Sequence, residues 1–252
     1  MTVEKQLDHT VGELKHTGRG ILLDIEGTTS PIAFVYDVMF PYVREHLDAY
    51  LEKHWDDDAT AAASEQIARD AGHDSLDDWL GEQSRENRIA AVRSEVIRLM
   101  DADVKATGLK SLQGLIWKDG FESGEMKARV FDDVEPALRR WSADGRDVRI
   151  YSSGSVAAQK LFFGHSIKGD LLSLLNGHYD TTTGPKREPE SYARIASAFG
   201  TPADEILFFS DVVAELDAAR EAGMRTALTV RPGNAPIEED HSHPIVHTFD
   251  GI

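Results

Sequence analysis

The sequence predicts an α/β protein with a doubly wound parallel sheet, into which a helical block is inserted. Residues 21–23 form an apolar run without alternation, which is typical of a strand buried on both faces of a parallel sheet. From residue 130 onward, short apolar runs alternate with helical patterns, as they do in chains that build such a sheet. Residues 31–124 lack these runs and space their apolar residues as helices do.

The first predicted strand ends in residues that can carry chemistry. Asp24 and Glu26 follow its last apolar residue, and a Gly-Thr-Thr run at 27–29 completes the turn. Carboxylates at the carboxyl end of a central strand lie where open α/β sheets bind their ligands. The plainer alternative is a strand that leads into a helix, with Asp24 or Thr28 as the helix cap.

The inserted block predicts a series of helices and two connections to the sheet. Apolar spacing indicates helices over residues 35–51, 61–71, 76–80 and 87–100 and an apolar face around 112–117. Glycines and charged residues at 118–127 predict the returning connection, and residues 30–32 the outgoing one. Two such connections can form a hinge, with Gly120 and Gly124 as pivots of the returning limb.

The second half of the chain predicts the remaining elements of the sheet. Pro136 in the first turn and Gly145 beyond the end delimit a helix over residues 134–143. The other predicted strands cover residues 148–151, 177–180, 206–209 and 226–230. Two further helices are predicted over residues 170–175 and 189–199. Two more helices follow the strands 148–151 and 206–209 and are predicted to end near residues 163 and 222. Right-handed crossovers bring the carboxyl ends of these strands to one edge of the sheet.

Composition excludes several classes of function. The 252 residues include 27 basic and 44 acidic ones, and the formal net charge of −17 argues against nucleic acid or an anionic membrane as a partner. Cysteine is absent, which excludes disulfides, thiolate metal sites and thiol nucleophiles. No apolar run has the length of a signal core or a membrane span, so we expect a soluble, cytoplasmic protein. We also expect it to be a monomer.

The predicted sheet edge collects polar groups that are far apart in the sequence. They are Asp24 and Glu26, Ser152 and Ser153 after the second strand, Lys186 in a Gly-Pro-Lys loop, and Asp211 with Glu215 after a later strand. Converging carboxylates repel one another or become protonated unless they share a cation. Oxygen ligands without cysteine or a neighbouring histidine favour Mg²⁺. Hydroxyls, backbone N–H groups and an ammonium can together bind a phosphate. A carboxylate can also act as a nucleophile and accept a phosphoryl group.

Several of these residues have plainer interpretations. Ser152 and Ser153 could cap the following helix. Lys186 could be a solvated loop lysine, and Glu215 could equally be a charge on the surface of a helix. The C-terminal tail has histidines at positions 241, 243 and 247, for which a solvated acidic tail is a better hypothesis than a second metal site.

The ordered motifs resemble a known superfamily. Asp-Ile-Glu-Gly-Thr at residues 24–28 resembles the first motif of the haloacid dehalogenase-like phosphatases, in which the second acid is usually Asp. Three later segments resemble the second, third and fourth motifs of the superfamily in that order. They are Tyr-Ser-Ser at 151–153, Lys186 with Pro189 and Tyr192, and Phe-Ser-Asp at 209–211 with Glu215. Other segments resemble one branch of this superfamily, the enolase-phosphatases of methionine salvage. They are Glu26 with the residues that follow it to position 35, and residues 150–156, 163–165 and 230–234. The resemblance covers residues 18–235.

This resemblance implies a domain organisation, a cofactor and a reaction. Residues 1–30 and 125–252 would form the core with the sheet, and residues 31–124 a helical cap. The branch uses Mg²⁺, one per subunit, and acts on a small phosphorylated substrate. It converts 2,3-diketo-5-methylthiopentyl-1-phosphate to the acireductone 1,2-dihydroxy-3-keto-5-methylthiopentene by enolisation and then dephosphorylation.

The resemblance also implies a role for each motif residue. Asp24 would be the nucleophile and a Mg²⁺ ligand. Glu26 would be the general acid and base and would lend an oxygen to the metal. Asp211 would complete the protein's metal ligands. The phosphate would be held by Ser152, Ser153 and Lys186, of which the lysine would also be catalytic.

Two other hypotheses stay open at this point. The chain could be a superfamily member with another leaving group, such as a dehalogenase or a sugar-phosphate phosphatase, although the Glu-Gly-Thr-Thr-Ser-Pro run at 26–31 argues against it. It could also be a non-catalytic phospho-acceptor module, because receiver domains share the acid cluster and the lysine. Receivers carry no insertion of this size. A stable phospho-Asp24 would favour the module.

Overall fold

The computed structural model describes residues 14–237 and 240–252, so most of the polar N-terminal lead-in lies outside the described residues. The chain divides into two compact units. The sheet unit comprises the described residues up to Phe34 and from Ala128 onward, and the helical unit is Val35–Lys127. The sequence placed these divisions after residues 30 and 124. Phe34 stays with the sheet unit because its ring packs edge-on against Phe162, with 5.8 Å between centroids.

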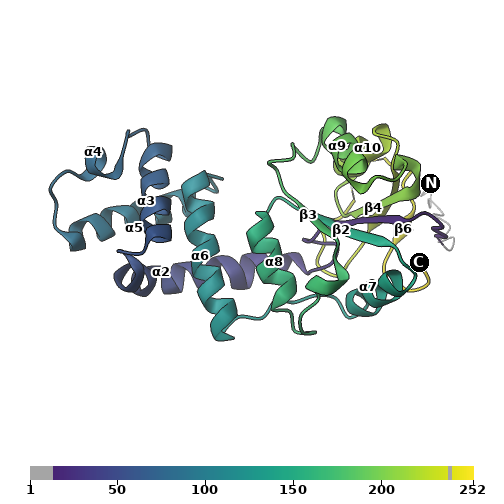
Figure 1. The fold of residues 1–252 in the computed structure, drawn as a ribbon, viewed down its shortest axis with the longest axis horizontal. Helices are drawn as coiled ribbons and strands as arrows, with labels where there is room; N and C mark the ends of the chain where they lie inside the picture. Colours follow the sequence, from purple (N-terminus) through teal and green to yellow (C-terminus); the bar gives the residue numbers. More distant parts are fainter. Residues whose placement is uncertain (1–13, 238–239) are drawn as a thin grey trace, which may run out of the picture. The chain divides into compact units, whose positions relative to one another are not determined.

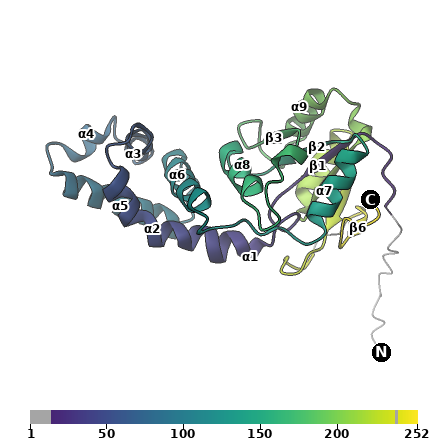
Figure 2. The ribbon, with the colours of Figure 1, turned by 60° about the horizontal axis from the view of Figure 1, so that its bottom comes forward.

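The sheet unit is built on parallel strands. In the part of the chain that the structure describes, six strands follow the order β3-β2-β1-β4-β5-β6, and each pairs in parallel with its neighbours. They are β1 (Gly20–Leu23), β2 (Asp147–Tyr151), β3 (Gly177–Tyr179), β4 (Ile206–Ser210), β5 (Arg225–Thr229) and β6 (Ile245–Val246). Strand β1 runs beside β2 (Figure 2). It lies between β2 and β4 and is buried throughout, which explains its unbroken apolar run.

Helices cover both faces of this sheet (Figure 1). They are α7 (Val134–Ala143), α8 (Val156–Gly164), α9 (Pro189–Phe199) and α10 (Val213–Glu221). On one face, Leu22 shares a buried cluster with Tyr192 of α9 and Leu216 of α10. On the other face, Trp141 of α7 stacks on Phe209, with 6.2 Å between ring centroids. The predicted fold class, an α/β doubly wound parallel sheet, is therefore confirmed.

Two segments of the sheet unit differ from the prediction. The helix predicted over residues 170–175 is reduced to the 3₁₀ turn Leu172–Leu174. The C-terminal tail is not solvated as expected, because β6 pairs with β5 and Phe249 is fully buried. His243 is buried as well, and its Nδ1 lies 2.7 Å from Thr226 Oγ1. A two-residue strand has too few residues to show a period, so packing alone reveals it.

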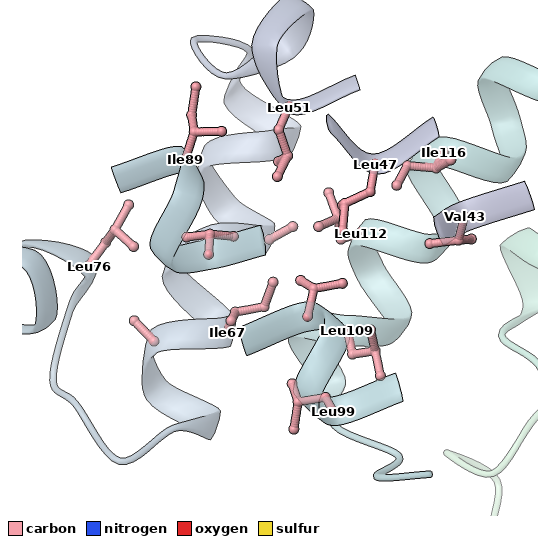
Figure 3. Packing of buried hydrophobic residues seen from close by; sticks show 14 of the residues in the cluster. Val43, Leu47, Leu51, Ile67, Leu76, Ile89, Leu99, Leu109, Leu112 and Ile116 are labelled. Carbon is pink, nitrogen blue, oxygen red and sulfur yellow. The ribbon is translucent and has the colours of Figure 1, made fainter. Parts of the chain in front are cut away.

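The helical unit has an apolar core of its own. After the short α1 (Ile32–Phe34) of the sheet unit, it contains a π-helical turn (Val35–Met39), α2 (Phe40–His54), α3 (Asp58–Asp70), α4 (Leu76–Leu80), α5 (Arg85–Asp101) and α6 (Thr107–Ser123). Leu47, Ile67 and Leu112 come from three different helices and belong to one buried cluster (Figure 3). Within the described residues, the search for a helix long and apolar enough to cross a membrane finds none.

The returning connection is shorter than the sequence predicted. Helix α6 continues to Ser123, so residues 118–123 are helical. Gly120 lies inside this helix, where a Cβ atom would come within 2.6 Å of the Tyr42 ring. It therefore serves close packing and is not a hinge pivot. Gly124 ends the helix with a φ of 81°, a left-handed conformation that favours glycine.

Candidate active site

The ends of β1 and β4 bring Asp24 and Asp211 to the same edge of the sheet. Leu23 is paired with Phe209, and the Asp24 N–H donates to the Phe209 carbonyl at 3.0 Å. Each acid directly follows its strand, and Asp24 is only 5% exposed. The two acids thus meet because neighbouring parallel strands end at the same level.

Lys186 is the cation at this edge. Its Nζ lies 2.8 Å from Asp24 Oδ2 and 2.6 Å from Glu215 Oε2, and its side chain is 10% exposed. Burial by itself would lower the pKa of Lys186, but the two carboxylates outweigh burial and hold this pKa above its ordinary value. The Tyr192 hydroxyl donates to the Lys186 carbonyl at 2.7 Å and fixes the loop. Lys186 is therefore a fixed, charged group and not a solvated lysine.

The structure decides between the two interpretations of Glu215. Its side chain is buried, pairs with Lys186 and accepts a hydrogen bond from Ser210 Oγ at 3.0 Å. Burial, followed by the charge of Asp24, raises the pKa of Glu215, and Lys186 opposes this rise. Glu215 is therefore part of the polar cluster and not a charge on the surface of α10.

Asp211 is largely buried beside other carboxylates. Burial, and after it the charge of Asp24, raises the pKa of Asp211 from 3.8 to about 7, with a smaller contribution from Glu26. Its Oδ2 lies against Gly27, where a Cβ atom would be 2.2 Å from this oxygen. Gly27 also has a φ of 68°. Glycine is therefore required at position 27 both for space and for its backbone conformation.

A tight turn carries Glu26. The N–H groups of Thr28, Thr29 and Ser30 converge on the Ile25 carbonyl at 3.2, 2.9 and 2.9 Å. Since α1 begins only at Ile32, the interpretation of this turn as a simple helix cap is wrong. The turn holds the backbone of Glu26 beside the strand end, and the charge of its half-buried side chain acts on Asp211.

The serines after β2 lie at the neighbouring strand end. Ser152 is buried, and its Oγ accepts a hydrogen bond from the Gly154 N–H at 3.3 Å, while Ser153 is exposed. Neither serine caps α8. Ser155 does so, by accepting from the Ala158 N–H at 3.2 Å. The capping interpretation is therefore wrong, and the Ser152 hydroxyl keeps a proton that it can donate to a ligand.

The donor set fits Mg²⁺ without a preformed cage of side chains. Within residues 14–237 and 240–252, no group of three or more His, Cys, Asp or Glu side chains is placed to hold a metal ion. Mg²⁺ does not need such a group, because one or two carboxylates, waters and substrate phosphate oxygens usually bind it. Burial raises the pKa of Asp211 most and the charge of Asp24 adds to this rise, and a divalent cation beside the two carboxylates would offset that charge.

Sequence reasoning missed several side chains that hold this site. Ser210 donates a hydrogen bond to Glu215. Its position directly before Asp211 could have indicated that it belongs to the site. Gln159 of α8 donates through Nε2 to the carbonyls of Gly154 and Tyr179, both at 2.8 Å, and so fixes the serine loop. A glutamine within a helix gives no local signal of such a role.

Comparison with known proteins gives the class of this molecule. A family model of the haloacid dehalogenase-like hydrolases matches residues 19–223. Among solved structures, the L-2-haloacid dehalogenase RSc1362 shares the fold, with a TM-score of 0.51 at 19% identity over 92% of this chain and 95% of that chain. The chain belongs to the haloacid dehalogenase-like hydrolase family.

Two closer relatives come from one branch of this family. The chain is 48% identical to enolase-phosphatase E1 of Branchiostoma floridae, over 92% of this chain and 82% of that protein. It is 46% identical to enolase-phosphatase E1 of Pseudomonas aeruginosa (strain LESB58), over 94% of this chain and 98% of that protein. The crystal structure of the UTR4 protein of Saccharomyces cerevisiae is 34% identical, with a TM-score of 0.77 over 93% of this chain and 100% of that chain. Within the superfamily, the chain is a member of the enolase-phosphatase E1 group.

Proposed function

We propose that this protein is a bifunctional enolase-phosphatase of methionine salvage. It converts 2,3-diketo-5-methylthiopentyl-1-phosphate to 1,2-dihydroxy-3-keto-5-methylthiopentene by enolisation and then dephosphorylation. The observation that carries the proposal is the buried Asp24–Lys186 pair, 2.8 Å between charged atoms, in a chain 46–48% identical to enolase-phosphatase E1 proteins. Mixing the protein with Mg²⁺ and the diketo phosphate should release equal amounts of phosphate and acireductone. Phosphate release from sugar phosphates alone would indicate another phosphatase.

Asp24 is the nucleophile of the dephosphorylation in this proposal. A carboxylate oxygen of Asp24 forms a bond to phosphorus while the phosphorus–ester oxygen bond breaks, and the electron pair leaves with that oxygen. Glu26 donates a proton to the departing oxygen. It then takes a proton from the water that hydrolyses phospho-Asp24, and phosphate leaves. Lys186, Ser152 and Ser153 hold the phosphate during both steps.

Asp24, Glu26 and Asp211 are the residues that would hold Mg²⁺, one ion per subunit. When bound, the ion offsets the charge of the phosphate and so lets the anionic Asp24 approach it. Asp24 also depends on Lys186, because the ammonium holds its carboxylate in place at 2.8 Å. The nucleophile thus depends on a fixed cation of the chain itself.

Asp211 should make the metal-free protein less stable as the pH rises. Its pKa is raised from 3.8 to about 7 on folding, so between these values the unfolded chain has lost the proton that the folded chain still binds. The free energy of unfolding therefore falls as the pH rises from about 4 to about 7. Asp211→Asn should flatten this fall and raise the melting temperature near pH 7.5, measured by circular dichroism in chelator. An unchanged pH profile would contradict the burial of charge at Asp211.

Glu26 is the proposed base of the enolisation. The proton leaves the carbon that bears the phosphate ester, so the base must lie near the phosphate. Its charge already acts on Asp211 at the strand ends. Asp24→Asn, blocked in phosphoryl transfer, should still exchange this proton with solvent deuterium, as measured by NMR, while Glu26→Gln should lose exchange by about 10²-fold or more. Exchange by Glu26→Gln at the wild-type rate would place the base elsewhere.

The helical unit, Val35–Lys127, is the proposed cap. Its support is its place in the sequence, directly after the turn that carries Glu26, and an apolar core that is separate from the sheet unit. The proposal also includes a monomeric, cytoplasmic enzyme. Sedimentation equilibrium and cell fractionation test these two points.

A further inference from the structure

The end of β5 and the segment that follows it hold the turn that carries Glu26. Asn234 Nδ2 donates to the Gly27 carbonyl at 2.9 Å, and Arg231 Nε donates to the Thr28 carbonyl at 3.1 Å. The hydroxyls of Thr28 and Thr229 lie 2.9 Å apart. A fourth, longer bond runs from the Thr229 hydroxyl to the Gly27 carbonyl at 3.4 Å. The turn is therefore fixed by side chains about 200 residues away in sequence.

The amide of Asn234 can have only one orientation. Its Nδ2 also donates to the Thr229 carbonyl, at 3.2 Å, so both amide protons are used on carbonyl oxygens. Rotating the amide by half a turn would place its oxygen against these carbonyls. Asn234 Oδ1 must therefore point away from them, and it is buried without a hydrogen-bond partner among the described residues.

The Oδ1 atom of Asn234 lies close to the carboxylate of Asp211. The position that a Cβ atom on Gly27 would take lies 3.1 Å from Asn234 Oδ1 and 2.2 Å from Asp211 Oδ2. The carboxylate of Asp211 takes the place that a side chain at position 27 would need. Two oxygens that accept hydrogen bonds thus lie close together beside Gly27, and a buried acceptor without a donor is unfavourable. A water that donates both protons, or a hydrated cation, satisfies both oxygens.

We propose that Asn234 is a positioning residue for Mg²⁺, whose Oδ1 accepts a hydrogen bond from a water bound to the ion held by Asp211. This inference rests on the proposed function. The ion polarises its waters and makes them strong donors, which suits an amide oxygen that has no other donor. Asn234 then joins two tasks: Nδ2 fixes the Gly27 turn, and Oδ1 orients the hydration of the metal.

The test compares metal binding in variants that separate these two tasks. Mn²⁺, used in place of Mg²⁺, is titrated into the metal-free full-length protein, and free ion is measured by EPR. Asn234→Leu removes Oδ1 and the bond to Gly27. Thr229→Val removes a weaker bond to the Gly27 carbonyl (3.4 Å) and the contact with Thr28, but leaves Oδ1 in place. The dissociation constant should rise by about 10-fold or more in Asn234→Leu and by less than about 2-fold in Thr229→Val.

Other outcomes overturn the proposal. Equal weakening in both variants would mean that Asn234 only fixes the turn, and wild-type affinity in Asn234→Leu would mean that Oδ1 has no part in binding. Asn234→Ala gives the same comparison if the leucine variant does not fold. A wild-type protein that takes up no Mn²⁺ would overturn the metal dependence of the proposed function itself, which is distinct from failure of Asn234 alone.

Discussion

Replacing Asp24 by Asn should lower kcat by about 10⁴-fold or more, because it removes the nucleophile and not only a contact. The amide is nearly the same size as the carboxylate but is a poor nucleophile. The substitution also removes one of the two negative charges that face Lys186. Turnover of the diketo phosphate, followed by phosphate release, measures the loss. Mass spectrometry of the acid-quenched wild-type enzyme should show phosphate on the peptide that contains Asp24.

Asp147→Asn is the matched control for this prediction. Asp147 begins β2, pairs with Arg149 at 2.6 Å and lies at the opposite end of the strand from the polar cluster. The same chemical change there should leave kcat within about 2-fold of wild type, because this ion pair lies away from the strand ends that carry the site. Substantial turnover by Asp24→Asn, or phosphate found on another residue, would contradict the assignment. Phospho-Asp24 that forms and persists without turnover would instead favour the receiver-like module.

Replacing Lys186 by Ala should lower kcat by about 10³-fold at every Mg²⁺ concentration. Lys186 faces Asp24 and Glu215 at once, so its loss removes a charge from the phosphate site and leaves two buried carboxylates unpaired. Asp211→Asn should behave differently. It weakens the proposed metal site, so a higher Mg²⁺ concentration should restore part of its activity. If added Mg²⁺ restores Lys186→Ala as well, the lysine acts only through the metal.

Loss of folding is a separate effect of Lys186→Ala, because breaking a buried ion pair costs about 3–5 kcal/mol. The double variant Lys186→Met with Glu215→Gln removes one positive and one negative charge and leaves Asp24 in place. It should recover thermal stability relative to Lys186→Ala but not turnover. Lys168→Ala, which breaks an exposed pair with Asp132 at 2.8 Å, controls for loss of a lysine and should keep full activity. Recovery of turnover in the double variant would make Lys186 a structural residue.

Local sequence determined the main elements of the sheet unit. A strand buried on both faces must be apolar throughout, so β1 and β4 were visible as runs, and the acids that follow them were located with them. Helix α7 has the predicted limits, 134–143, because Pro136 suits only the first turn and Gly145 takes a φ of 71° beyond the last. These signals involve neighbouring residues and need no knowledge of packing.

The candidate site was predictable as a set of residues but not as a set of contacts. Chain order and crossover handedness predicted that Asp24, Ser152, Lys186 and Asp211 lie at one edge of the sheet. That Lys186 bridges Asp24 and Glu215 could not be derived, because its loop has no period or spacing that fixes the direction of the side chain. The roles of these residues stay predictions that the variants above test.

The tertiary structure alone decided which polar residues turn inward. Glu215 has the sequence signature of a surface charge on a helix, and only the arrival of Lys186 from a separate loop makes its burial favourable. Gly120 resembles a hinge glycine until the Tyr42 ring is placed against it. Asn234 resembles a turn residue until both its amide protons are used by distant carbonyls. Sequence periodicity reports the average polarity of a face, whereas the partner of one buried polar atom depends on segments that only folding brings together.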